Sequence, residues 1–278
     1  MEQDKKIPPD DAAEQDVLTA LVGAALAPVE VPHDRQRRLQ GRLLERVAAS
    51  AARHARTRCV RLVDGAWRRL KSGVEVKSLS AGRAGNSVLI RLAAGATLPV
   101  HRHQWLEEGI ILEGGFRIEG QDLGPGDYHV SPADSVHGRI VSPAGGVAYL
   151  RGTAIGDTTA MMRELVGGLL PLGQHSACTV TARDMAWSAV VPGIDQHVVW
   201  SDGTVVSRFL RLAAGSRLDL PAAADGASDS EAIVVSGDAF LGDILLRAGE
   251  FALEPAGGGF ESVSSDVGAV VFLRGPAA

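Results

Sequence analysis

The sequence predicts a mainly β protein, in which a short N-terminal helical segment is followed by two consecutive β domains. Glycine accounts for 33 of the 278 residues and aromatic residues for only 4%, a composition typical of short strands joined by tight turns. Helical periodicity dominates only about the first 56 residues, and short apolar runs broken by turn residues follow. The remainder repeats itself at an offset of about 120 residues, which indicates two related domains.

Residues 1–56 are the predicted N-terminal arm, a disordered tail followed by two helices. Residues 1–16 are polar and acidic, so they are expected to be mobile. The first helix is expected over 12–26 and ends before Pro28, because proline interrupts helical hydrogen bonding. The second helix starts near His33 and is amphipathic. Its apolar face is formed by Leu39, Leu43, Leu44 and Val47. Its other faces carry Arg35, Arg38, Arg42 and Arg46.

The arginines of the second helix are open to three interpretations. They form a solvated face beside the apolar stripe, they contact an acidic protein partner, or they contact a second copy of the chain in a homodimer. The net charge of −5 argues against a general nucleic-acid binder. No segment is long and apolar enough to cross a bilayer and no signal-peptide pattern is present, so a cytoplasmic location is expected.

Residues 57–157 and 158–278 are the two predicted β domains. A loop and a helix around 158–170 are expected to join them. The offset between matching tracts grows from 120 to 123 residues, so an insertion of about three residues near 223–229 accounts for the change. The tracts are RLAAG at 91–95 and 211–215, and LRG at 150–152 and 273–275.

Four side chains of the first repeat have the spacing of metal ligands: His101, His103, Glu107 and His137. Residues i and i+2 of a strand share a face, so the first two histidines are expected to project together. His137 reaches them from a neighbouring strand, after the turn marked by Gly126 and Pro132. Three imidazoles and a carboxylate suit zinc, iron, manganese, nickel or copper better than magnesium or calcium. The sequence therefore predicts one divalent transition metal in this domain.

The second repeat lacks these ligands. A comparison of the two repeats therefore indicates which of the adjacent residues Glu107 and Glu108 is the metal ligand. Because Glu107 is lost together with the histidines, we expect it to be the ligand. Glu108 is retained in a domain without a site, so we expect it to serve the fold, and opposite strand parity allows only one of the two to face the barrel interior. The aligned residues are Pro221 for His101, Ala223 for His103, Phe260 for His137, Ser230 for Glu107 and Glu231 for Glu108.

Other polar residues are assigned weaker roles. His129, His175 and His197 have no partners at ligand spacing and are predicted to be structural or on the surface. Three further residues in strands of the first repeat could reach the pocket, namely Arg117, Arg139 and Tyr149.

The spacing G-x5-H-x-H-x3-E-x6-G from Gly95, followed by G-x5-P-x4-H from Gly126, resembles the two motifs of the cupin superfamily. The resemblance implies two tandem cupin domains, each a jelly-roll β-barrel, the first binding one metal at its mouth and the second degenerate. Two positions depart from the motifs. Asp134 stands where the second motif usually has glycine, and Val141 where it often has asparagine.

Within that superfamily the first repeat is most similar to the cupin domain of ChrR-like anti-sigma factors. The resemblance implies a cytoplasmic sensor linked to stress-responsive transcription, with zinc as the metal and a sigma factor as a partner of the arm. The H…C-x-x-C zinc motif of that family's N-terminal domain is absent, and Cys59 and Cys178 cannot supply it, because both lie in the β repeats. The alternative is a metal-dependent cupin dioxygenase or related oxidoreductase, with iron, manganese or nickel acting on a small molecule.

Overall fold

The computed structural model describes residues 9–26, 31–169, 177–221 and 228–277. The chain divides into two compact units, Met1–Ala55 and Arg56–Ala278. The first unit contains helices α1 (Pro9–Ala25) and α2 (His33–Arg53). The tail predicted over residues 1–16 is wrong from Pro9 onward, because proline suits a helix's first turn and the helix begins there. Residues 1–8 of that predicted tail lie outside the described part of the chain.

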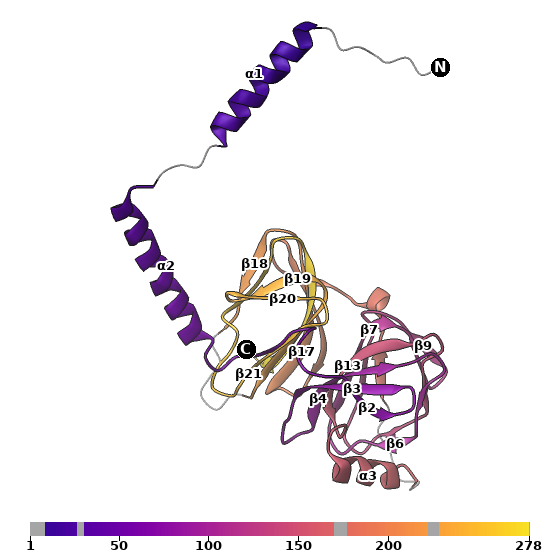
Figure 1. Cartoon of the computed structure of the whole chain (residues 1–278). Helices are drawn as coiled ribbons and strands as arrows, with labels where there is room; N and C mark the ends of the chain where they lie inside the picture. The colour runs from indigo at the N-terminus through magenta and orange to yellow at the C-terminus, as the bar shows by residue number, and fades with distance from the viewer. Residues whose placement is uncertain (1–8, 27–30, 170–176, 222–227, 278) are drawn as a thin grey trace, which may run out of the picture. The chain divides into compact units, whose positions relative to one another are not determined.

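The second unit is mainly β, as predicted, and its first barrel is built on a seven-stranded antiparallel sheet (Figure 1). In spatial order this sheet contains β14 (Cys178–Val180), β10 (Tyr128–Ser131), β7 (Glu107–Gly114), β13 (Gly146–Thr153), β4 (Asn86–Leu92), β3 (Val74–Ser80) and β2 (Arg68–Lys71). Two smaller sheets complete the barrel, one made of β11 (Val136–His137) and β6 (His101–Arg102), the other of β5 (Thr97–Leu98), β12 (Ile140–Val141), β8 (Phe116–Ile118) and β9 (Gln121–Leu123).

The second barrel is built on a ten-stranded sheet. Its main path contains β1 (Arg58–Val60), β21 (Phe251–Glu254), β19 (Ser230–Leu241), β23 (Ala269–Pro276), β17 (Val205–Leu212), β16 (Ile194–Ser201) and β15 (Ser188–Val191), with β18 (Ser216–Asp219), β20 (Ile244–Arg247) and β22 (Ser262–Ser265) off that path. Helix α3 (Thr158–Gly167) lies in the connection between the repeats, and the short 3-10 helix η1 (Ala182–Asp184) lies in the second repeat between β14 and β15. No helix in the described residues is long and apolar enough to span a membrane.

The two barrels exchange one strand each. Strand β1 opens the first repeat but pairs with β21 of the second barrel, with Cys59 opposite Ala252. Strand β14 opens the second repeat but pairs with β10 of the first barrel, with Cys178 opposite Val130. The two cysteines occupy equivalent positions in the repeats, and the exchange is therefore reciprocal. Each repeat therefore supplies the outermost strand on one side of the other barrel's sheet and covers the edges of β21 and β10.

An apolar layer joins the barrels and includes aromatic rings from both repeats. Tyr149 and Phe272 occupy equivalent positions, and their ring centroids lie 6.1 Å apart. The residues of this layer that are almost fully buried include Leu79, Ile110, Tyr128, Tyr149, Phe209, Ile233, Phe251 and Phe272.

Two buried ion pairs cross the same layer. The Glu108 carboxylate of the first repeat lies 3.3 Å from Nε of Arg274 in the second. In the equivalent pair, Arg151 Nε of the first repeat lies 3.2 Å from the Glu231 carboxylate of the second. Both arginines come from the repeated LRG tract, and both glutamates follow the Glu107 position or its equivalent. The glutamates kept in both repeats therefore hold the barrels together.

Candidate metal centre

Two strands place His101 opposite His137. The residues are direct Cα partners in the antiparallel pair β6–β11, so their side chains project on the same face. Their imidazole rings are stacked, with centroids 5.5 Å apart and an interplanar angle of 3°. The chain between the two motifs thus places His137 on the strand beside His101, as the spacing predicts.

His103 and Glu107 complete the group. His103 follows β6, and its side chain is 1% exposed, with Nδ1 3.8 Å from Oε1 of Glu107. The potential ligand atoms of His101, His103 and Glu107 all lie within 4.8 Å of one another. The His137 ring centroid is 5.5 Å from that of His103, as it is from that of His101. The potential ligand atoms of His101, His103 and Glu107 therefore meet in one place, and the His137 ring lies beside them.

The hydrogen bonds around the imidazoles leave nitrogen lone pairs for a metal. Nδ1 of His101 lies 2.9 Å from the carbonyl oxygen of Pro99, and Nδ1 of His137 lies 3.2 Å from that of Gly138. A carbonyl only accepts, so each Nδ1 donates its proton and each Nε2 keeps a free lone pair. His103 is buried and neither ring nitrogen has a hydrogen-bond partner. A buried imidazole without partners is costly, and a metal ion would satisfy it.

Burial keeps His103 and His137 neutral. Desolvation, with a smaller contribution from His101, lowers the pKa of His103 to about 3. Desolvation also lowers the pKa of His137 to about 4, although the Glu107 carboxylate opposes the shift. Only a neutral imidazole can donate a lone pair to a metal. At neutral pH both rings are therefore in the form that binds metal.

The two adjacent glutamates point in opposite directions. Glu107 lines the internal cavity beside the histidines, whereas Glu108 is 0% exposed and accepts a hydrogen bond of 2.7 Å from the Tyr128 hydroxyl. Glu108 belongs to the layer between the barrels, where it also faces Arg274. The alternation of a strand thus assigns one carboxylate to the cavity and the other to the barrel interface.

Asp134 fits the turn before His137, although the second cupin motif usually has glycine at this position. Asp134 has φ 65°, in the left-handed region, and the equivalent Gly257 has φ 78°. Aspartate is among the few residues that adopt this conformation at modest cost. The Asp134 amide donates to the carbonyl oxygen of His103 at 2.8 Å, and the His103 amide donates to that of Ser135 at 3.0 Å. The turn therefore fixes the backbone of His103.

The cluster opens into a cavity of about 300 Å³ inside the first barrel. Helix α3, which lies beside β6 (Figure 1), forms one wall. Its N-terminus is capped by Asp157, which accepts a hydrogen bond of 3.0 Å from the amide of Ala160. Gln104 joins this helix to the loop that carries His103. Its side chain donates to the Ala160 carbonyl at 2.9 Å, and its backbone amide donates to the Glu164 carboxylate at 3.2 Å.

Two cavity residues were not predicted. Glu164 of α3 lines the cavity, and burial raises its pKa to about 7. His129 was predicted to be structural or on the surface, but it lines the cavity too, with its ring centroid 4.9 Å from that of His137. Its Nδ1 lies 2.8 Å from the hydroxyl of Thr179 on the exchanged strand β14. The second repeat thus supplies a contact to a residue beside the cluster.

Several residues expected near the pocket lie elsewhere. Arg117 is exposed and pairs with Asp122, and the Tyr149 hydroxyl donates to Glu231 at 2.8 Å between the barrels. Arg139 is exposed and is not among the residues that line the cavity. The prediction that these side chains could reach the pocket is therefore wrong. His175 lies outside the described residues.

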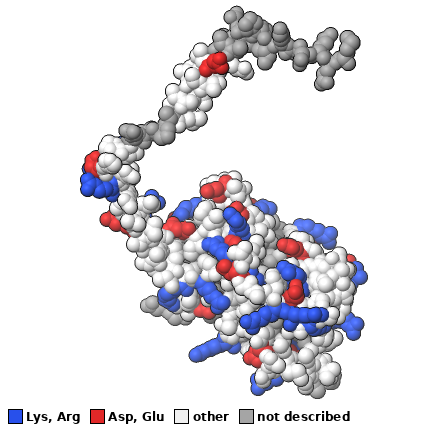
Figure 2. Space-filling view, viewed as in Figure 1, with Lys and Arg blue, Asp and Glu red and all other residues white. Residues whose placement is uncertain are grey.

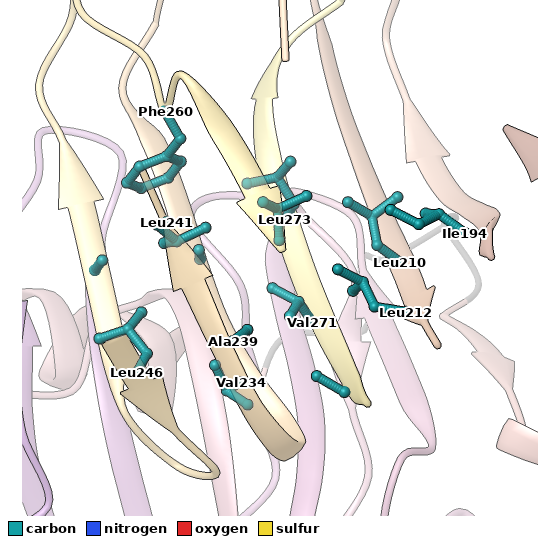
Figure 3. Close-up of a cluster of buried hydrophobic side chains, with 14 residues drawn as sticks. Ile194, Leu210, Leu212, Val234, Ala239, Leu241, Leu246, Phe260, Val271 and Leu273 are labelled. Atoms are coloured by element: carbon teal, nitrogen blue, oxygen red, sulfur yellow. The ribbon is translucent and has the colours of Figure 1, made fainter. Parts of the chain in front are cut away.

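The second barrel is filled where the first has its cluster. Phe260, at the position of His137, is 8% exposed and packs in the apolar core near Leu241 and Leu273 (Figure 3). Ser230, at the position of Glu107, is buried, and Pro221, at the position of His101, is exposed. The predicted counterpart of His103, Ala223, lies outside the described residues.

Comparisons with known proteins agree with this geometry. Residues 55–154 match the family described as the ChrR cupin-like domain. The anti-sigma-E factor ChrR of Cereibacter sphaeroides is 34% identical over 77 residues, which are 28% of this chain and 36% of that protein. The match thus spans about a third of the relative's length.

Solved structures resemble the chain over most of its length. A putative dioxygenase from Nostoc punctiforme has a TM-score of 0.58 at 11% identity, covering 79% of this chain and 82% of its own. Oxalate decarboxylase from Lactobacillus farciminis has a TM-score of 0.55 at 13% identity, covering 78% and 85%. Bacillus subtilis oxalate decarboxylase has a TM-score of 0.54 at 15% identity, covering 89% and 84%. At these identities the likeness concerns the fold alone: the two barrels share the fold of these structures, and residues 55–154 match the ChrR cupin-like family.

Proposed function

We propose that this protein is a ChrR-like regulatory bicupin, which senses its surroundings through one metal ion bound by His101, His103, Glu107 and His137. Zinc is the proposed ion, because neutral imidazoles and one carboxylate form a common zinc-binding set. The observation that carries the proposal is that this cluster lies within residues 55–154, the part of the chain that matches the ChrR cupin-like domain.

The proposal divides the chain into an arm over 1–56, a metal-binding cupin domain over 57–157 and a degenerate cupin domain over 158–278. The strand exchange and the ion pairs described above join the last two. We propose that the degenerate domain serves as a scaffold for the first, in part through Thr179 beside His129.

The arm is the proposed contact for a protein partner. Helix α2 has an amphipathic sequence, and Leu39, Leu43, Leu44 and Val47 are each more than half exposed. Its many arginines favour an acidic partner such as a sigma factor. The face of the barrel unit in Figure 2 has acidic and basic side chains interspersed, which does not favour direct nucleic-acid binding there. A cytoplasmic homodimer is part of this proposal.

A second candidate function is supported by the cavity. A purely structural zinc has four ligands in a closed shell, whereas this cluster opens into about 300 Å³ of space. Room beside a metal is what a substrate needs, so a metal-dependent oxidoreductase acting on a small molecule is the alternative. Protein from its native source that contains iron and consumes oxygen with a small-molecule substrate would favour this candidate, and redox-silent zinc would favour the regulator.

Changing Leu39 and Leu43 together to serine in the full chain tests the regulatory proposal. The double variant is expected to weaken capture of a purified extracytoplasmic-function sigma factor from the same organism by at least about tenfold, because apolar side chains spaced i and i+4 are the anchors that an amphipathic helix buries in a partner's groove. Surface plasmon resonance measures the affinity. Metal content is expected to remain that of the unchanged protein, because the arm contributes no ligand.

The matched control replaces Val190 and Val198 with serine, since both are exposed on the second repeat. This control should bind the sigma factor as the unchanged protein does. Equal capture by both double variants would contradict the assignment of the arm as the contact. Failure of the unchanged protein to bind any such sigma factor would contradict the anti-sigma role itself.

A further inference from the structure

The cavity of the first barrel has two chemically distinct parts. One part is formed by the titratable residues described above, whose side chains lie together: His101, Glu107, His129, His137 and Glu164. The other part is the apolar core of the barrel, which contributes a continuous set of buried side chains. The cavity residues that belong to this core are Ile90, Leu98, Ile111, Phe116, Ile118, Ile140 and Ala148.

The remaining walls add little polarity. Helix α3 contributes Met161, Met162 and Leu165, and β2 contributes Leu70. Lys71 is the single basic residue, apart from the histidines, among the described residues that line the cavity, and no arginine is present. A small dianion would be recognised by several basic groups or bidentate arginines. The walls of this cavity instead match a molecule with one polar end and an apolar body.

We infer that the cavity binds a medium-chain aliphatic monocarboxylate, or a molecule of that chemistry, as the effector of the proposed sensor. The carboxylate lies at the end formed by the histidines and Glu107, and the hydrocarbon chain lies against the apolar core. One negative charge on the ligand balances a divalent ion held by neutral imidazoles and a single carboxylate. This inference rests on the proposed function, because it uses the same metal cluster.

A homologous series of ligands tests the inference directly. Butanoate, hexanoate and octanoate are titrated into the zinc-loaded full-length protein by isothermal calorimetry, with oxalate as the dianion. Each added methylene is expected to tighten binding about fourfold, because burial of one CH2 contributes about 0.8 kcal/mol. Oxalate should bind more weakly than octanoate. Equal affinities across the series, or tighter binding of oxalate, would overturn the inference.

Substitution of Ala148 tests whether octanoate binds in the cavity. Ala148 lies on β13, is 3% exposed and lines the cavity. A148L should weaken octanoate binding at least about tenfold by filling the apolar part. A148V introduces the residue that the second repeat has at the equivalent Val271, and it should weaken binding less. The matched control is A189L, at an exposed position on the second repeat, and it should bind octanoate normally.

The outcomes separate the inference from the function on which it rests. Zinc content measured on the same samples should be unchanged in A148L, A148V and A189L, since none of these substitutions alters a metal-binding side chain. If the unchanged protein holds zinc and A148L binds octanoate as tightly as A189L does, the cavity inference is wrong and the metal proposal stands. If the unchanged protein holds no metal at this cluster, the proposed function is wrong as well.

Discussion

The double variant with His101 and His103 changed to alanine is expected to lose bound metal almost completely at neutral pH. Two of four ligands disappear, and the loss of even a group that only orients a ligand lowers metal affinity about 10- to 100-fold. We therefore expect a decrease of more than about a hundredfold, from one ion per chain to a trace. Metal content after gel filtration and dialysis, measured by plasma mass spectrometry, gives the result.

The control for this experiment replaces two histidines outside the cluster. His33 lies at the start of α2 and His197 on β16 of the second repeat, so H33A/H197A should keep one ion per chain. The circular dichroism of both double variants should match that of the unchanged protein, because the second barrel and the core of the first are not altered. Retention of a full complement of metal by H101A/H103A would contradict the proposed site.

The second large effect is expected at the ion pairs between the barrels. Arg274→Met leaves the Glu108 carboxylate buried without its ion-pair partner, with the Tyr128 hydroxyl and the more distant charge of its cross-strand neighbour Arg151 remaining. Removal of one member of a buried ion pair typically costs about 3–5 kcal/mol, because the other charge stays without compensation. The free energy of unfolding in urea should decrease by this amount. The exposed pair Arg217–Asp219 supplies the control, and R217M should have little effect.

A second substitution separates charge from packing in that result. Adding Glu108→Gln to Arg274→Met removes the stranded charge but keeps an oxygen that accepts the Tyr128 hydroxyl. The double variant should recover a large part of the lost stability. If E108Q/R274M is no more stable than R274M alone, lost packing accounts for the effect and the ion pair does not.

Local spacing was enough to bring the four candidate ligands together. The i, i+2 relation placed His101 and His103 near each other, and the second motif placed His137 on the neighbouring strand, where it pairs with His101. The repeat comparison separated Glu107 from Glu108, because a residue used only by the site disappears when the site does. The positions of these side chains could be predicted because they depend on strand parity and one tight turn, and metal binding by them stays a prediction.

The repeats also contain a signal that His129 lies in the cavity. Its equivalent in the second repeat is Ala252, so this histidine is lost together with the others. Its neighbours Tyr128 and Val130 belong to the apolar layer between the barrels, which leaves His129 on the opposite face of β10. Alternation and the repeat together therefore indicated a cavity residue.

Other features depend on contacts that no local pattern records. The docking of α3 relies on Gln104 and Glu164, which are separated by 60 residues, so Glu164 could not be assigned to the cavity from its own helix. The strand exchange is hidden for a related reason. Both barrels offer equivalent edges to β1 and β14, and the sequence of a three-residue strand does not specify which edge it joins.

The most direct test of the account is the anomalous diffraction of crystals of the natively purified, full-length protein, recorded on both sides of the absorption edge of its metal. The account predicts one anomalous peak per chain, in the first barrel, at coordinating distance from His101, His103, Glu107 and His137. It predicts none beside Phe260 in the second barrel. A peak bound by other side chains, or a metal-rich protein with no peak at these four residues, would contradict it.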